Sequence, residues 1–251
     1  MRKFLGYYLL ALATCWFVTS RVAFAHDLVF IPEGSSALVI KFGHPGRYEP
    51  PDPHKLIKLQ AYSPAGSEPT SLLDSVEPGS GVLAAKRPEK AAIVIGEYDN
   101  GYWVGSAGKR YLNTSKINFP TASDSGSNFK YAKVLIWVPN TAVSFSHPIG
   151  EGLELVPQSD PFTLKSGQSL SVLLLYQGKP LPAVGLEIGD GKTPMKEEDI
   201  PRYKTNGDGV AVVPIARQGL QVIAVDYQTA PRHPDLGDHD NYGATLTFVL
   251  R

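Results

Sequence analysis

The stretch "RYKTNGDGVAVVPI", residues 202–215, decides the fold class of this chain. Its centre, "NGDG" at residues 206–209, is typical of a tight turn because Asn, Asp and Gly tolerate the left-handed backbone that such turns need. Apolar residues on both sides predict a strand before the turn and a strand after it, as in a hairpin. An EF-hand calcium loop would need more acidic donors and flanking helices, so the turn is the better interpretation.

The same pattern of short apolar runs between turn clusters continues in both directions, without helical periodicity. Turn-forming segments include "GHPGRYEPPDP" at 43–53 and "TASDSGSN" at 121–128. In "YDNGYW", Asn100-Gly101 predicts another hairpin turn, with an aromatic sugar-binding platform as the alternative. The sequence therefore predicts an all-β protein. Strands are expected in the first half at 27–30, 37–42, 55–62, 81–84, 91–98 and 131–138.

The strand pattern predicts two β-sandwich domains. Residues 26–157 would form the first, and residues 158–251 a small Ig-like, Greek-key sandwich with turns every few residues. The boundary is placed near Pro157, where "ELVPQSDP" brings two prolines between the two strand-rich blocks. We expect the second block to fold independently.

Residues 1–25 have the pattern of a secretory signal peptide. Arg2 and Lys3 precede an apolar run that is too short for a spanning helix, and Ala23-Phe24-Ala25 matches a cleavage site. Cys15 is an alternative lipid attachment site, but the apolar run continues beyond it. Cleavage after Ala25 would give an exported chain that begins at His26.

Charge and cysteine content restrict the function. The chain has 24 basic and 24 acidic residues, and loss of Arg2, Lys3 and Arg21 leaves 21 against 24. A net charge of about −3 argues against nucleic acid as a partner. Cys15 is the single cysteine, so the mature chain could form no disulfide, and any metal site would use nitrogen and oxygen donors.

Several phrases resemble a known bacterial family. They are "HDLVFIP", "GHPGRYEPPDPHKL", "YDNGYW", "KYAKVLI", "LELVPQSDPFTLKSGQSLSVLLLYQGKPL" and "NYGATLTFVL". Together and in this order they resemble a periplasmic domain-of-unknown-function family described as the periplasmic component of cobalt and nickel uptake systems. The resemblance implies a periplasmic protein that works beside a membrane metal transporter, and it implies no catalytic residue. Leu28-Val29-Phe30 stand where the family often has Trp.

A chain that begins at His26 carries an α-amine and an imidazole on the same residue, and both can bind one metal ion. The amine has an ordinary pKa of about 7.7 to 8.0, so a divalent metal can displace its proton near neutral pH. Nitrogen donors of this kind suit Ni²⁺, Co²⁺ and Cu²⁺. The alternative is a frayed terminus without a role.

Two loops supply further candidate ligands. The Pro-rich loop after the second predicted strand contains His44, Asp52 and His54, and "PRHPDLGDHDNY" contains His233 and His239. Dense nitrogen and oxygen donors of this kind can bind divalent metals, but they can equally be solvated loop side chains.

We therefore expect a periplasmic nickel- or cobalt-binding protein that passes its ion to a membrane importer and is not an enzyme. No G-x-S-x-G or H-E-x-x-H motif is present. Two alternatives remain: a metal-free adhesion or carbohydrate-binding sandwich, and a copper oxygenase that uses a histidine brace at His26.

Overall fold

The computed structural model describes residues 26–64, 68–105, 112–150 and 152–251, and the predicted signal peptide lies outside them. The described residues form an all-β protein, as predicted, with short 3₁₀ turns and no α-helix. None of their helices is long and apolar enough to cross a membrane. The strands are β1 Asp27–Glu33, β2 Ala37–His44, β3 Arg47–Glu49, β4 Leu56–Tyr62, β5 Thr70–Ser71, β6 Glu77–Pro78, β7 Leu83–Lys86, β8 Ile93–Gly105, β9 Asp124–Leu135, β10 Leu153–Pro157, β11 Ser169–Tyr176, β12 Lys179–Pro180, β13 Gly185–Gly189, β14 Arg202–Lys204, β15 Val210–Pro214, β16 Gly219–Thr229 and β17 His239–Leu250.

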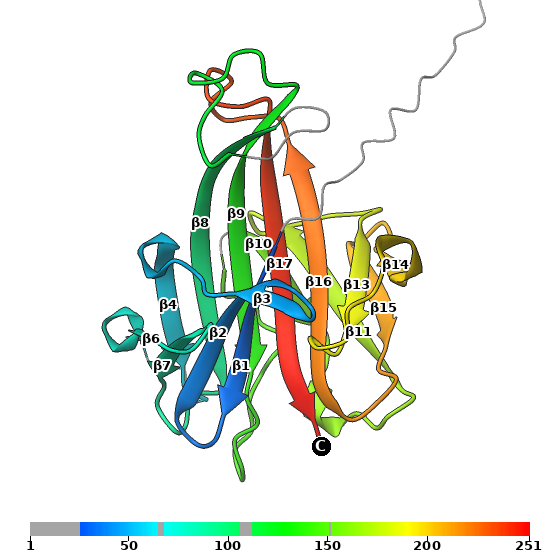
Figure 1. Ribbon diagram of the computed structural model, residues 1–251. Coiled ribbons are helices and arrows are strands. Elements are labelled where there is room, and N and C mark those ends of the chain that lie inside the picture. Colours follow the sequence, from blue (N-terminus) through cyan, green and yellow to red (C-terminus); the bar gives the residue numbers. More distant parts are fainter. Residues whose placement is uncertain (1–25, 65–67, 106–111, 151) are drawn as a thin grey trace, which may run out of the picture.

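The centre of the molecule is an eight-stranded sheet in the order β14-β13-β16-β17-β9-β8-β4-β5. Long strands β16, β17, β9 and β8 run side by side through the middle (Figure 1). β17 pairs with β9 in parallel, with Gly243 opposite Lys130, and this pairing joins the two halves of the chain. The central sheet therefore contains strands from both sides of Pro157.

A smaller sheet covers each face of the central sheet, so the fold has three layers. The front sheet has the order β1-β2-β7-β6 with β3 beside β2, and the back sheet has the order β10-β11-β12 with β15 beside β11. Alternate residues of one central strand point to the two sides: Val94 of β8 joins the front core, and Ile93 and Ile95 join the back core. The sandwich packing expected from the sequence is present, with the central sheet shared by both sandwiches.

Two predicted turns differ from the structure, and a third was placed correctly. Asn100-Gly101 forms a bulge inside the continuous strand β8, where the register shifts between Asp99 and Tyr102, so the predicted hairpin is wrong. The polar segment 121–128 was predicted as a turn, but β9 already begins at Asp124. The turn at 206–209 forms as predicted, but the strands beside it, β14 and β15, belong to different sheets, so the predicted hairpin is wrong here too.

Candidate functional site

The hairpin of β1 and β2 brings His26 and His44 together. Its register pairs Asp27 with Gly43, so the next position on each strand places His26 opposite His44. Facing residues of an antiparallel pair lie on the same side of the sheet. The two imidazole ring centroids are 4.8 Å apart, at an angle of 31°. Among the predicted histidine ligands, these two are the pair whose rings lie in contact in the described part of the chain.

A row of aromatic rings extends from His26 toward the Pro-rich loop. Phe42 lies 5.2 Å from His26 and 4.8 Å from Tyr98, measured between ring centroids. The Tyr98 hydroxyl accepts a hydrogen bond from the Asp52 backbone N–H, 3.1 Å away. The Asp52 carboxylate accepts from the His54 backbone N–H and caps the 3₁₀ turn Pro53–Lys55. Asp52 and the exposed His54 therefore lie at the far end of this row from His44.

Charged side chains that the sequence reasoning missed lie beside the histidine pair. Lys130 of β9 is almost fully buried and forms an ion pair with Asp226 of β16, at 3.2 Å. A side-chain carbon on Gly243, in the strand between them, would lie 2.5 Å from the Lys130 ammonium, so the glycine makes room for this pair. Burial, together with the negative charges of Asp226 and Glu187, raises the pKa of Asp27 to about 8 against the opposing effect of Lys130.

The environment of His44 favours its neutral form. Burial lowers the pKa of its imidazole, and the neighbouring His26, Lys130 and Arg47 act in the same direction, whereas Asp226 opposes them. A neutral imidazole has the free lone pair that a metal ion requires. His44 can therefore serve as a ligand at neutral pH.

A pocket of about 480 Å³ opens next to Asp27 and His44. It lies over the part of the central sheet that carries Val222 and Ala224 of β16. The β2–β3 hairpin and the segment that follows β13 form its other walls. The Tyr48 hydroxyl donates to the Gly191 carbonyl oxygen at 2.8 Å and connects these two walls.

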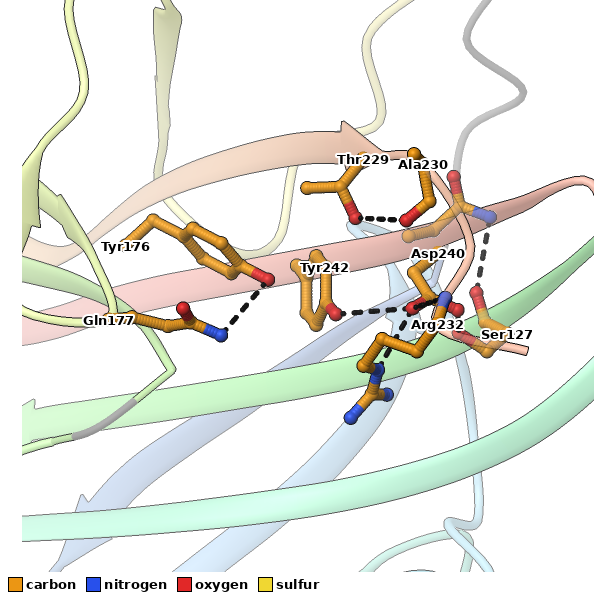
Figure 2. Close-up of polar contacts among 9 residues, drawn as sticks. Ser127, Tyr176, Gln177, Thr229, Ala230, Arg232, Asp240 and Tyr242 are labelled. Atoms are coloured by element: carbon orange, nitrogen blue, oxygen red, sulfur yellow. Dashed lines mark hydrogen bonds and ion pairs between the residues drawn. The ribbon is translucent and has the colours of Figure 1, made fainter. Parts of the chain in front are cut away.

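The predicted ligands of the C-terminal loop lie elsewhere and take part in a separate polar network. His239 begins β17, and its Nε2 is 3.6 Å from Asp124. Asp240 accepts hydrogen bonds from the Ser127 hydroxyl and from the Nε of Arg232, and Figure 2 shows the contact with Arg232. The exposed His233 uses its backbone carbonyl to accept from the amides of Leu236 and Gly237.

This loop is separated from the histidine pair along β17. His239 and Gly243, where the Lys130–Asp226 pair crosses the strand, are four residues and on the order of 13 Å apart along β17. Within the part of the chain that the structure describes, no three His, Cys, Asp or Glu side chains form a metal-binding group. A site at His26 would accordingly use two imidazoles and the α-amine.

Comparisons with known proteins find a family of unknown function and an uncharacterized bacterial relative. An uncharacterized protein of Haemophilus influenzae is 31% identical over 193 residues, which cover 76% of this chain and 75% of that protein. The model of the family named domain of unknown function DUF4198 matches residues 23–229, which include β1, β2 and the histidine pair. The chain therefore belongs to the DUF4198 family.

Proposed function

We propose that the mature protein binds one divalent transition-metal ion, such as Ni²⁺, Co²⁺ or Cu²⁺, through the α-amine and imidazole of His26 and the imidazole of His44. The observation that carries this proposal is the 4.8 Å separation of the two rings. Two imidazoles that bind one ion at about 2.0–2.1 Å have centroids roughly 4.5 to 6.5 Å apart. The separation of the two rings supports a shared ion.

The role we propose for the ion is transport. The protein would hold it in the periplasm and pass it to a membrane importer of nickel or cobalt, in keeping with the uptake systems that the sequence resembles. Nitrogen ligands that have lost their protons to the metal hold the ion near pH 7, and their reprotonation or competing ligands on the importer release it. The low pKa of His44 supports retention at neutral pH.

The test compares three forms of the mature chain by isothermal titration with Ni²⁺ and Cu²⁺ at about pH 7.5. One extra residue ahead of His26, or His44→Ala, should each weaken binding at least about tenfold, equivalent to roughly 1.4 kcal/mol. His147→Ala is the control, because His147 is exposed and lies outside the hairpin. If the extended chain binds as tightly as the native one, the α-amine is not a ligand and the proposal is wrong.

A copper oxygenase is the second candidate, because the same amine and the same two imidazoles form a histidine brace. It predicts that the copper-loaded protein oxidises a polysaccharide when peroxide is added. If the native protein releases oxidised sugar and His44→Ala does not, the protein is an oxygenase, and the proposed transport role is wrong. A protein that binds no metal under either condition would favour the metal-free adhesion or carbohydrate-binding module.

A further inference from the structure

The pocket beside His44 is much larger than a metal ion requires. Its volume is about 480 Å³, and pockets for small organic molecules usually measure roughly 300–1,000 Å³. His44 lines the pocket itself, so an ion bound to its imidazole would lie at the pocket wall. Part of the coordination sphere of that ion would face the empty volume.

The walls of the pocket combine apolar surface with charged side chains of both signs, and Asp27 and Glu187 are the acidic ones. Ile188, Val222 and Met195 supply apolar contacts, and Met195 is 44% exposed. Arg47 and Lys196 also line the pocket, and neither forms an ion pair with a side chain that the structure describes. Glu187, in contrast, pairs with Arg202 at 2.8 Å. The cations available to a ligand are therefore those of Arg47 and Lys196.

The two walls are already held together without a ligand. The Tyr48–Gly191 hydrogen bond of 2.8 Å joins the β2–β3 hairpin to the segment after β13. Gly46 packs against the Pro194 ring, where a side-chain carbon would come within 3.1 Å of the ring. A preformed pocket binds a small molecule with a smaller loss of conformational entropy than a flexible one.

We infer that the ion is bound as a complex with a small, carboxylate-bearing chelating molecule. The chelator fills the coordination positions that face the pocket. One of its carboxylates contacts Arg47 and Lys196, and its carbon skeleton lies against the apolar wall. This inference rests on the proposed function, because it uses the same ion at His26 and His44.

Equilibrium dialysis of the mature chain with radiolabelled citrate, malate or histidine tests the inference, each with and without Ni²⁺. We expect at least one of the three to be retained at about one molecule per chain, and only when Ni²⁺ is present. Arg47→Gln and Lys196→Gln should each weaken that retention about fivefold or more, close to 1 kcal/mol. Lys196→Gln should leave the affinity for Ni²⁺ alone within about twofold, because Lys196 does not lie beside His44 in the β2–β3 pairing.

Lys192→Gln is the matched control, because Lys192 is exposed on the same segment but does not line the pocket. If Ni²⁺ binds and none of the three molecules is retained, the inference is wrong and the proposed function stands. An equal loss of retention in Lys192→Gln would likewise overturn the inference. The loss would then come from the lower net positive charge of the protein and not from contacts inside the pocket. If the native chain retains neither Ni²⁺ nor its complexes, the proposed function fails as well.

Discussion

His26 and His44 lie together for a reason that can be found in the sequence. Strands 27–33 and 37–44 flank the three residues 34–36, and a hairpin closed by that loop places His26 opposite His44. The sequence reasoning identified both histidines but treated the second as part of a loop. The Lys130–Asp226 pair could not be found in this way, because 96 residues separate the two and their contact depends on the parallel pairing of β9 with β17.

At the same scale, Asp190 leads to a prediction about pH. Burial alone would raise the pKa of its carboxyl, but hydrogen bonds from the Thr193 amide and hydroxyl and the Lys192 amide, with the Arg217 charge, lower it to about 2. A folded-state pKa below the unfolded value of 3.8 means that this carboxylate stabilises the fold above about pH 4. That contribution is lost as the pH falls toward 2.

Asp190→Asn should therefore lower the free energy of unfolding by roughly 1–2 kcal/mol at pH 7, allowing for solvent screening. The difference from the native protein should shrink between pH 4 and pH 2. Urea unfolding of both proteins at pH 7, 4 and 2 measures it. A difference that is the same at all three pH values would show that the amide disturbs the turn by another route.

The strands themselves were largely predictable, since apolar runs bounded by turn residues located β1, β2, β4, β7 and the start of β8 to within a few residues. The start of β9 was missed because Ser125 and Ser127 are small and polar, yet both are buried. Their hydroxyls donate to Asp238 and Asp240 of the C-terminal loop. Such partners, more than 100 residues away, leave no local signal in the sequence.

A buried ion pair between β9 and β10 connects the central and back sheets and leads to a prediction at the scale of these elements. Lys133 of β9 and Glu154 of β10 contact each other, with side chains only 6% and 5% exposed. The Glu154 carboxylate also accepts from the Ile149 and Gly150 amides. Lys133→Met leaves this carboxylate buried without its cation, so we expect a loss of about 3–5 kcal/mol in the free energy of unfolding.

Lys133→Met combined with Glu154→Gln should recover at least about half of that loss, because the amide oxygen is neutral and still accepts from the two backbone groups. Lys58→Met is the control: the Lys58–Glu97 pair is 30% and 24% exposed, and its loss should cost less than about 1 kcal/mol. Urea unfolding measures all of these variants. Equal losses for the single and double variants would show that the unpaired charge of Glu154 is not the cause of the loss.

At the scale of the whole molecule, the division into two domains at Pro157 stays a prediction, and the shared central sheet bears on it directly. β10 ends at Pro157 and pairs with β11 across the predicted boundary. β17 pairs with β9, which belongs to the first block. A cut at this point removes one neighbour from each of two strands and exposes their edges.

The back core is divided by the same cut, and this leads to a prediction about the isolated second block. Seven of its 21 buried residues precede residue 158, and they are Ala92, Ile93, Ile95, Leu135, Phe145, Leu153 and Leu155. Each large apolar side chain contributes about 1.5–3 kcal/mol when buried, while a whole domain is stable by only about 5–15 kcal/mol. We therefore expect residues 158–251 alone to show no cooperative thermal transition by circular dichroism. The chain 26–251 should show one under the same conditions. Residues 153–251, which restore β10, should give a transition more like that of the chain 26–251 than residues 158–251 do. A cooperative transition of 158–251 alone would instead establish the sequence-based boundary and show that the second sandwich does not need β9 or β10 to fold.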